Sequence, residues 1–386
     1  MSTTPETAMS EDDRWMAEAI EIAWGGLGNV EPNPMVGCVL VRDGRSIGRG
    51  YHERYGEGHA EVNALADCRT QGNTAEGATA YVTLEPCCHF GKTPPCADAL
   101  INAGVARVVV AVVDPFDQVD GGGVQRLRNA GVDVVTGVMT SRAESQLAAY
   151  LKRVRTSRPW VIAKWAMSMD GRIATTTGES QWITGPASRV GVHELRGRVD
   201  GIAVGMGTVI ADDPMLTARH GGPRTPARIV FARKRLPSLT SKLVQTASEV
   251  PVWIVAGPEL PETELSLLSE RGVHVLPVAS DDVVAMIDEA LLRFGGKDNP
   301  SGQPMTHLMI EGGGELTGSF VAGEFVDECH VYIGAKVIGG RTAAGPVGGN
   351  GIQLLADATR FTVDDVTRFE DDVRVIYRRA VGAAES

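Results

Sequence analysis

His59-Ala60-Glu61 and Pro86-Cys87-Cys88-His89-Phe90-Gly91-Lys92-Thr93-Pro94-Pro95-Cys96 are the two stretches around which this sequence is organised. Neutral imidazole and thiolate are good zinc ligands, and a hydrolytic zinc keeps three protein ligands with water in the fourth position. Three residues of these stretches can supply such a set: His59, Cys87 and Cys96. Glu61 follows the histidine by two residues. We therefore expect Glu61 to move protons between the zinc-bound water and a leaving amine.

The cysteine spacing leaves alternatives open. Zinc-dependent nucleobase deaminases carry H-x-E followed by P-C-x-x-C, with the Glu as general acid and base. Here the first half fits, but Cys87 and Cys96 are nine positions apart. Two other interpretations are a pair of buried cysteines acting as small hydrophobic residues and a closed structural zinc that adds Cys88 or His89 as a fourth ligand.

The flanking residues favour the catalytic interpretation. Residues 78–84 are apolar and β-branched, which predicts a buried strand, and Glu85-Pro86 ends it. Pro94-Pro95 precedes an apolar helical run over 96–103, where proline is tolerated at the first turn. The cysteines thus fall where a strand ends and a helix begins, which is where open α/β sheets place their sites.

Composition narrows the class of protein. A chain of 386 residues predicts two or three domains, and 43% hydrophobic content is that of a globular protein. The net charge of −11 argues against nucleic acid as a partner. Six cysteines in so long a chain are no disulfide framework and indicate a reducing cytoplasm. No 18-residue apolar run and no signal segment is visible, so we expect a soluble protein without membrane association.

The first half alternates strands with helices. Ser10 and Asp13 can cap a helix. A hairpin is predicted over 36–50, with its turn at Asp43-Gly44. The alternation continues to a helix over 141–151, which predicts an α/β sandwich. Residues 152–159 form a short basic connector, so we expect domains over 11–152 and 158–386.

The second half contains a strand that runs into glycines. Residues 307–311 lead into Gly312-Gly313-Gly314, and a helix is expected from about Glu315. Backbone amides at such a helix start can approach a pyrophosphate. However, no G-x-G-x-x-G fingerprint is present, so the residues alone suggest a nicotinamide cofactor only weakly, and a simple tight turn is the alternative.

At the level of motifs, the sequence resembles the bacterial bifunctional riboflavin-biosynthesis deaminase/reductase family. The family pattern P-N-P-x-V-G, G-Y-H, H-A-E and T-L-E-P-C-x-H-x-G-x-T-P-P-C is matched by residues 32–37, 50–52, 59–61 and 83–96. The nine-residue cysteine spacing is the one this family uses. The resemblance runs from about Ala17 to the last strand.

The resemblance implies an N-terminal cytidine-deaminase-like α/β/α sandwich that binds zinc through His59, Cys87 and Cys96. It implies that Glu61 is catalytic and that the substrate is held by Asn33, His52, His89 and Lys92. The family often has asparagine after Asp114-Pro115, whereas this chain has Phe116.

For the second half, the resemblance implies a dihydrofolate-reductase-like α/β domain that binds NADPH. The implied cofactor-binding residues are Ala166, Trp182, Thr208, Asp212, Arg233, Gly313, Gly314, Glu315, Leu316, Thr317, Gly318 and Ser319. The implied substrate-binding residues are Ser180, Arg196, Leu216, Arg219 and Glu311. Where the family has an aspartate-containing turn after Arg-Ile-Val, this chain has Arg233-Lys234-Arg235, and we interpret this run as a site for the 2′-phosphate of NADPH.

The reactions implied are zinc-dependent hydrolytic deamination of 2,5-diamino-6-(5-phosphoribosylamino)pyrimidin-4(3H)-one and NADPH-dependent reduction of the ribose of 5-amino-6-(5-phosphoribosylamino)uracil to the ribityl chain. The expected partners are these small phosphoribosylated pyrimidines, and we expect a homo-oligomer. Two rival functions are a deaminase of free or tRNA-borne bases and a zinc-stabilised binding protein with degenerate sites. The acidic balance and the second domain argue against the first rival. Four protein ligands on the metal and no NADPH binding would favour the second.

Overall fold

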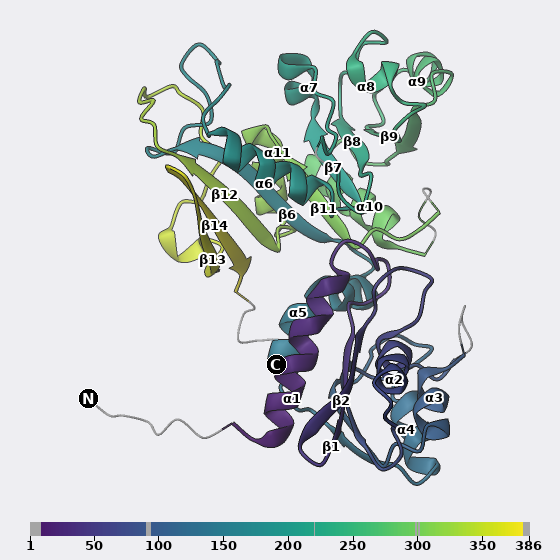
Figure 1. Ribbon diagram of the computed structural model, residues 1–386. Coiled ribbons are helices and arrows are strands. Elements are labelled where there is room, and N and C mark those ends of the chain that lie inside the picture. Colours follow the sequence, from purple (N-terminus) through teal and green to yellow (C-terminus); the bar gives the residue numbers. More distant parts are fainter. Residues whose placement is uncertain (1–8, 90–93, 220, 298, 300–301, 381–386) are drawn as a thin grey trace. The chain divides into compact units, whose positions relative to one another are not determined.

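The computed structural model describes residues 9–89, 94–219, 221–297, 299 and 302–380 (Figure 1). Lys92, expected to bind substrate, lies outside these residues. The chain divides into two compact units between Thr156 and Ser157. No helix in the described part combines the length and apolarity that a bilayer crossing requires.

The first unit contains a five-stranded sheet in the order β2-β1-β3-β4-β5. β1 pairs antiparallel with β2 and β3, whereas β3, β4 and β5 are parallel. The strands are β1 (Gly37–Arg42), β2 (Arg45–Tyr51), β3 (Thr79–Leu84), β4 (Arg107–Val112) and β5 (Asp133–Thr136). The predicted hairpin is therefore confirmed as β1 and β2.

Helices cover both faces of this sheet (Figure 1). One face packs on α2 (Ala60–Thr70), α3 (Cys96–Asn102) and α4 (Gly122–Asn129) through a cluster that includes Leu65 and Leu100. The other face packs on α1 (Glu11–Ala23) and α5 (Thr140–Thr156) through a second cluster that includes Met16 and Leu147. The result is the predicted α/β/α sandwich. The single turn η1 (Trp24–Gly26) follows α1.

Two local features of the sandwich bear on sequence expectations. The Ser10 hydroxyl accepts from the Asp13 amide at 3.1 Å, and the Asp13 carboxylate accepts from the Ser10 amide at 3.2 Å, which completes a capping box. By contrast, α5 continues to Thr156, so the first part of the basic stretch expected as a connector is helical. The reason is that Tyr150 and Leu151 are buried on the sheet and the helical hydrogen bonding simply continues past them.

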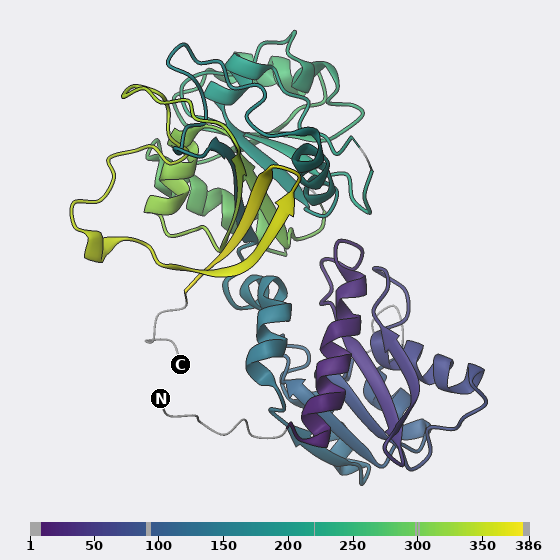
Figure 2. The ribbon, with the colours of Figure 1, turned by 60° about the vertical axis from the view of Figure 1, so that its left-hand side comes forward.

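The second unit contains a nine-stranded sheet in the order β10-β9-β8-β7-β11-β6-β12-β14-β13. The strands from β10 to β12 are parallel, and β14 and β13 add as an antiparallel hairpin, drawn in yellow in Figure 2. The strands are β6 (Trp160–Ser168), β7 (Gly201–Gly205), β8 (Ala227–Ala232), β9 (Val252–Ala256), β10 (His274–Pro277), β11 (His307–Glu311), β12 (Glu328–Gly334), β13 (Phe361–Phe369) and β14 (Asp372–Arg379).

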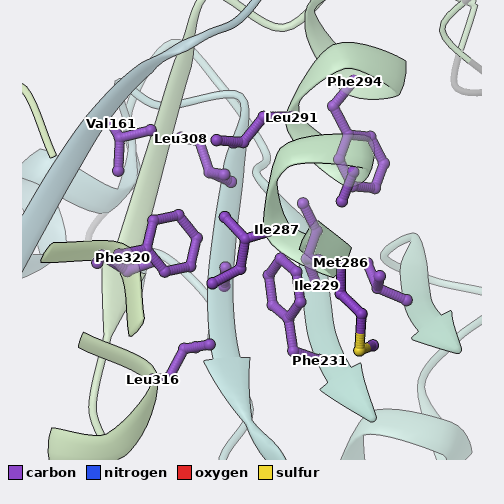
Figure 3. Packing of buried hydrophobic residues seen from close by; sticks show 14 of the residues in the cluster. Val161, Ile229, Phe231, Met286, Ile287, Leu291, Phe294, Leu308, Leu316 and Phe320 are labelled. Carbon is purple, nitrogen blue, oxygen red and sulfur yellow. The ribbon is translucent and has the colours of Figure 1, made fainter. Parts of the chain in front are cut away.

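Helices connect the parallel strands, as crossover connections require. They are α6 (Pro186–Arg196), α7 (Met206–Asp212), α8 (Lys242–Gln245), α9 (Glu262–Ser269), α10 (Val283–Gly295) and α11 (Gly314–Ala322), with the short turn η2 (Leu355–Asp357) before the terminal hairpin. α10 and α11 pack on one face of the sheet, where Ile287 and Leu291 meet Leu308 and Phe320 (Figure 3).

Phe320 is the residue we choose to test this core. It is fully buried, and its ring lies edge-on to Phe231 with 5.8 Å between centroids. Phe320→Ala should destabilise the second unit by about 3–5 kcal/mol, because the lost apolar contacts leave a cavity. Guanidinium unfolding followed by tryptophan fluorescence measures this change.

Leu355→Ala is the matched control. Leu355 is 89% exposed, so its truncation should change the free energy of unfolding by less than about 0.5 kcal/mol. Equal effects of the two substitutions would contradict the assignment of Phe320 to the core.

Candidate functional site

Three zinc-type side chains meet at the carboxyl end of β3. His59 immediately precedes α2, Cys87 follows β3 by three residues, and Cys96 begins α3. The Cys96 Sγ lies 3.3 Å from His59 Nδ1, and the Cys87 Sγ lies 3.7 Å from it. All three donor atoms lie within 4.8 Å of one another. Residues from separate parts of the sequence therefore surround one point.

The pKa values of the two thiols are shifted in opposite directions. The pKa of Cys87 is lowered to about 4, because Cys96 and then His59 hydrogen-bond to its thiolate, outweighing burial. The Cys96 backbone N–H also donates to Cys87 Sγ at 3.3 Å. The pKa of Cys96 is raised by the neighbouring Cys87 and by burial. One imidazole and two sulfurs are donors that zinc prefers, and the lowered pKa of Cys87 favours its thiolate, so these residues fit the metal.

Glu61 lies in the first turn of α2, two residues after the ligand His59. Its side chain is 3% exposed, and burial raises its pKa to about 7. It hydrogen-bonds with Cys96. A carboxyl group that is half-protonated near neutral pH is suited to accept and return a proton.

Three further residues are expected to bind substrate, namely His52, Asn33 and His89, and the first of them contacts a ligand of the cluster. His52 is buried and its ring meets His59 edge-on at 5.1 Å. Its Nε2 lies 3.2 Å from Asn33 Nδ2. His89 is half-buried, its ring is 6.3 Å from that of Phe116, and its Nδ1 has no hydrogen-bond partner within the described residues. Phe116 thus stands beside His89 at the position where the family often has asparagine.

Glu85 is a buried carboxylate that the sequence analysis passed over. It accepts three backbone N–H groups, from Asp114 at 3.2 Å, Gly121 at 3.0 Å and Val124 at 2.9 Å. These bonds tie the loop after β4 and the start of α4 to the turn that carries Cys87. An acidic residue between a buried strand and a proline was the available signal, because such a carboxylate needs partners once buried.

In the second unit, the residues expected to bind NADPH gather at one edge of the sheet. Ala166 lies near the end of β6, Thr208 follows β7, Arg233 follows β8 and Gly313 follows β11. These four strands are mutual neighbours and parallel. Their carboxyl ends consequently share one edge, where α/β sheets bind nucleotides.

The glycine turn after β11 fits a dinucleotide phosphate. Gly312 and Gly313 have φ of +91° and +75°, and a Cβ on either would meet Thr208 at 3.2 Å. α11 then begins at Gly314. Its first N–H groups have no intrahelical partner and favour an anion.

An ionic triad whose side chains are only 11–14% exposed lies directly before this turn. Glu311 accepts from Lys164 Nζ at 2.8 Å and from Arg196 Nε at 2.8 Å, while Arg196 Nη1 donates to the Thr217 carbonyl at 3.0 Å. Lys164 and Glu311 are register partners on the parallel strands β6 and β11. Lys164 is not among the site residues predicted from the sequence, although a lysine inside an otherwise apolar strand indicates a partner within the protein.

The structure separates the remaining expected residues into two groups. The side chains of Leu216 and Leu316 are part of the hydrophobic core, and Thr317 and Gly318 are buried in α11, so only backbone groups of these residues can face a ligand. The accessible or partly accessible residues are Ser180, Trp182, Asp212, Arg219, Glu315 and Ser319. Trp182 is 55% exposed, with the Arg189 guanidinium 4.6 Å from its ring centroid.

Comparison with known proteins identifies the family of each unit. The zinc-binding region of cytidine and deoxycytidylate deaminases matches residues 9–112, and the RibD C-terminal domain matches 159–375. The riboflavin biosynthesis protein RibD of Escherichia coli K12 is 41% identical over 381 residues, covering 94% of this chain and 98% of its own length. The chain belongs to the RibD family.

Solved structures give the same result. RibD of Acinetobacter baumannii superposes with a TM-score of 0.81 at 36% identity, covering 96% of this chain and 99% of that chain. A diaminohydroxyphosphoribosylaminopyrimidine deaminase/5-amino-6-(5-phosphoribosylamino)uracil reductase from Thermotoga maritima superposes with a TM-score of 0.79 at 32% identity, covering 96% and 99%.

As a RibD protein, the chain is a bifunctional deaminase/reductase of riboflavin biosynthesis. The cytidine-deaminase-like fold of the first half and the reductase fold of the second are confirmed. Zinc serves the deaminase domain and NADPH the reductase domain.

The ionic triad predicts how the stability of the second unit changes at acidic pH. Burial alone would raise the pKa of Glu311, but Lys164 and Arg196 lower it to about 2. A carboxyl group whose pKa is lowered in the folded protein stabilises the folded state, and this stabilisation is fully present at pH values above its ordinary pKa of 4.5. That contribution, at most about 3 kcal/mol, should be lost as the pH falls from about 5 towards 2.

Urea unfolding of wild type and Glu311→Gln at several pH values measures this contribution. The glutamine variant should be less stable at pH 7, because two cations lose their partner, and the difference should shrink as the pH falls below about 5. Glu262→Gln, at an exposed position on α9, is the control. A difference that stays constant with pH would contradict the ionic account of Glu311.

Proposed function

We propose that residues 11–152 deaminate 2,5-diamino-6-(5-phosphoribosylamino)pyrimidin-4(3H)-one and that residues 158–386 reduce the ribose of 5-amino-6-(5-phosphoribosylamino)uracil to a ribityl chain. The observation that carries the first assignment is the meeting of His59, Cys87 and Cys96 beside buried Glu61. The two compact units support the division of labour. The six free cysteines support a cytoplasmic setting.

In the deaminase, the metal when bound supplies a Lewis acid that activates water near neutral pH. The protein contributes the proton transfers. Glu61 accepts the proton of the attacking water and delivers it to the departing amino nitrogen, so that ammonia can leave. We assign His89, which follows Cys87 by two residues, to substrate binding and Asn33 to orienting the pyrimidine.

In the reductase, NADPH when bound supplies the hydride. The glycine turn and the start of α11 hold its pyrophosphate. Glu311, kept ionised by Lys164 and Arg196, can accept hydrogen bonds from substrate hydroxyls. Arg196 already uses its Nε and Nη1 on Glu311 and Thr217. We therefore assign Arg196 to orienting Glu311, and the exposed Arg219 to the substrate phosphate.

The basic run Arg233-Lys234-Arg235 is our candidate for the 2′-phosphate of NADPH. It follows β8, which is separated from β11 by β7 alone, so it lies roughly 10 Å along the sheet edge from the glycine turn, given about 4.8 Å between strands. Lys234 pairs with Glu259 at 3.7 Å, and both side chains are exposed. Such a pair contributes little, which leaves Lys234 able to exchange Glu259 for a phosphate.

Glu61→Gln tests the deaminase assignment. Deaminase turnover should fall by about 10²–10⁴-fold, the usual contribution of a general acid and base, while zinc content and NADPH oxidation with the reductase substrate stay unchanged. Ammonia release and absorbance at 340 nm measure the two activities.

Glu57→Gln, at an exposed carboxylate of the same unit, is the control and should keep both activities. Deamination retained by Glu61→Gln would refute the role of Glu61.

The double variant R233A/K234A tests the basic run. Its affinity for 2′,5′-ADP should fall about 10–100-fold, as expected for the loss of charge-assisted hydrogen bonds, while its affinity for 5′-AMP stays unchanged. Isothermal titration calorimetry measures both constants. Arg271→Ala, at an exposed arginine of the same unit, should leave both unchanged. An unaltered preference for the 2′-phosphate in R233A/K234A would remove this run from the cofactor site.

A further inference from the structure

His52 has the surroundings of a residue that acts through a neighbour. It is 2% exposed, and both of its ring nitrogens already have partners within the protein. Nδ1 lies 3.0 Å from the Gly58 carbonyl oxygen, and Nε2 lies 3.2 Å from Asn33 Nδ2. An imidazole with both nitrogens engaged has none left for a substrate.

The partner of Nδ1 defines the tautomer. A carbonyl oxygen can only accept a hydrogen bond, so Nδ1 must carry the hydrogen. In the neutral ring, Nε2 is then an acceptor. No acidic side chain is hydrogen-bonded to His52 within the described residues, so nothing in direct contact favours the doubly protonated ring.

The tautomer in turn orients the Asn33 amide. An accepting Nε2 requires a donor, and of the two ends of the amide only Nδ2 can donate. The oxygen Oδ1 is therefore directed away from His52. Asn33 is half-buried, and Oδ1 has no hydrogen-bond partner in the described part of the chain.

We propose that His52 is a positioning residue, which locks Asn33 with its carbonyl oxygen towards the substrate, and that this oxygen accepts a ring N–H or exocyclic amino hydrogen of the pyrimidine. This inference rests on the proposed deaminase function. It assigns His52 no contact with substrate. A reversed amide would present NH₂ and would select a pyrimidine acceptor instead, so the orientation decides which edge of the ring is bound.

The Gly58 carbonyl, which accepts the hydrogen bond from His52, is itself held in place. The Gly58 carbonyl also accepts from Asn63 Nδ2 at 3.2 Å, and Asn63 Nδ2 lies 2.8 Å from the Tyr51 carbonyl. Asn63 is in α2, whose first turn also holds Glu61. A series of hydrogen bonds therefore runs from α2, which also carries Glu61, through the Gly58 carbonyl and His52 to Asn33.

The tautomer is directly measurable. In the zinc-loaded protein labelled with ¹⁵N-histidine, a two-bond ¹H–¹⁵N correlation spectrum should show His52 with Nδ1 protonated and Nε2 unprotonated. Loss of one of the eight histidine patterns in His52→Gln assigns the signal. A ring protonated at Nε2, alone or together with Nδ1, would overturn the proposal. This readout involves no turnover, so it is independent of the outcome for Glu61→Gln.

A double-mutant cycle tests whether His52 acts through Asn33. Asn33→Ala should lower deaminase kcat/KM about 10–100-fold, as for the loss of one substrate hydrogen bond. His52→Leu should lower it nearly as far. The double variant should match Asn33→Ala within about twofold, because no amide is left to orient. Effects that multiply would show direct contact of His52 with substrate and overturn the proposal.

Further variants distinguish a positioning role of His52 from a general disruption of the deaminase site. His52→Gln can still donate to Gly58 and accept from Asn33, so it should recover most of the kcat/KM that His52→Leu loses. Asn63→Ala removes the other donor to Gly58 but leaves the His52–Asn33 contact, so any effect it has should multiply with that of Asn33→Ala. Zinc content and reductase turnover should be unchanged throughout. Zinc loss in both His52 variants would assign the imidazole to the metal-ligand turn instead and overturn the proposal.

Discussion

Parallel pairing of strands is the constraint on which both sites depend. Strands that run in the same direction end at the same edge, and each end is followed by a turn and a helix start with free backbone N–H groups. In the first unit, β3 and β4 deliver Cys87 and the Asp114 loop to one edge. In the second, β6, β7, β8 and β11 do the same for the cofactor residues. Segments far apart in sequence become neighbours because their strands are neighbours.

Three carboxylates that are buried or nearly so show how their hydrogen-bond partners set their chemical role. Glu85 is satisfied by three backbone N–H groups and holds a loop in place. Glu311 is satisfied by two cations and stays ionised. Glu61 has no ion pair among the described residues, and its burial raises its pKa to about 7. The residue is glutamate at each position, so the partners decide whether the carboxylate is a structural clamp, a fixed charge or a group suited to carrying a proton.

Much of the fold could be predicted because it depends on local patterns. Alternating strands and helices, the turn at Asp43-Gly44 and the Ser10 capping box are all encoded within a few residues, and the structure contains each of them. The end of α5 was harder. Basic residues from Lys152 onward suggest a connector, but burial of the preceding Tyr150 and Leu151 carries the helix to Thr156. Tertiary packing outweighed composition there.

The sequence by itself determined which chemistry is possible: residue type and spacing provide candidate metal donors, an acid beside them and a glycine turn, while other interpretations of the cysteines and glycines stay open. Only the tertiary structure decided which polar side chains have partners. Lys164 and Glu311 are 147 positions apart, and Asn33 and His52 are 19 apart. The first pairing follows from strand register and the second from the turn around Gly58 at the start of α2. These pairings decide which polar groups already have partners within the protein. Hydrogen-bond partnership depends on distances between non-local segments, which no spacing along the chain specifies.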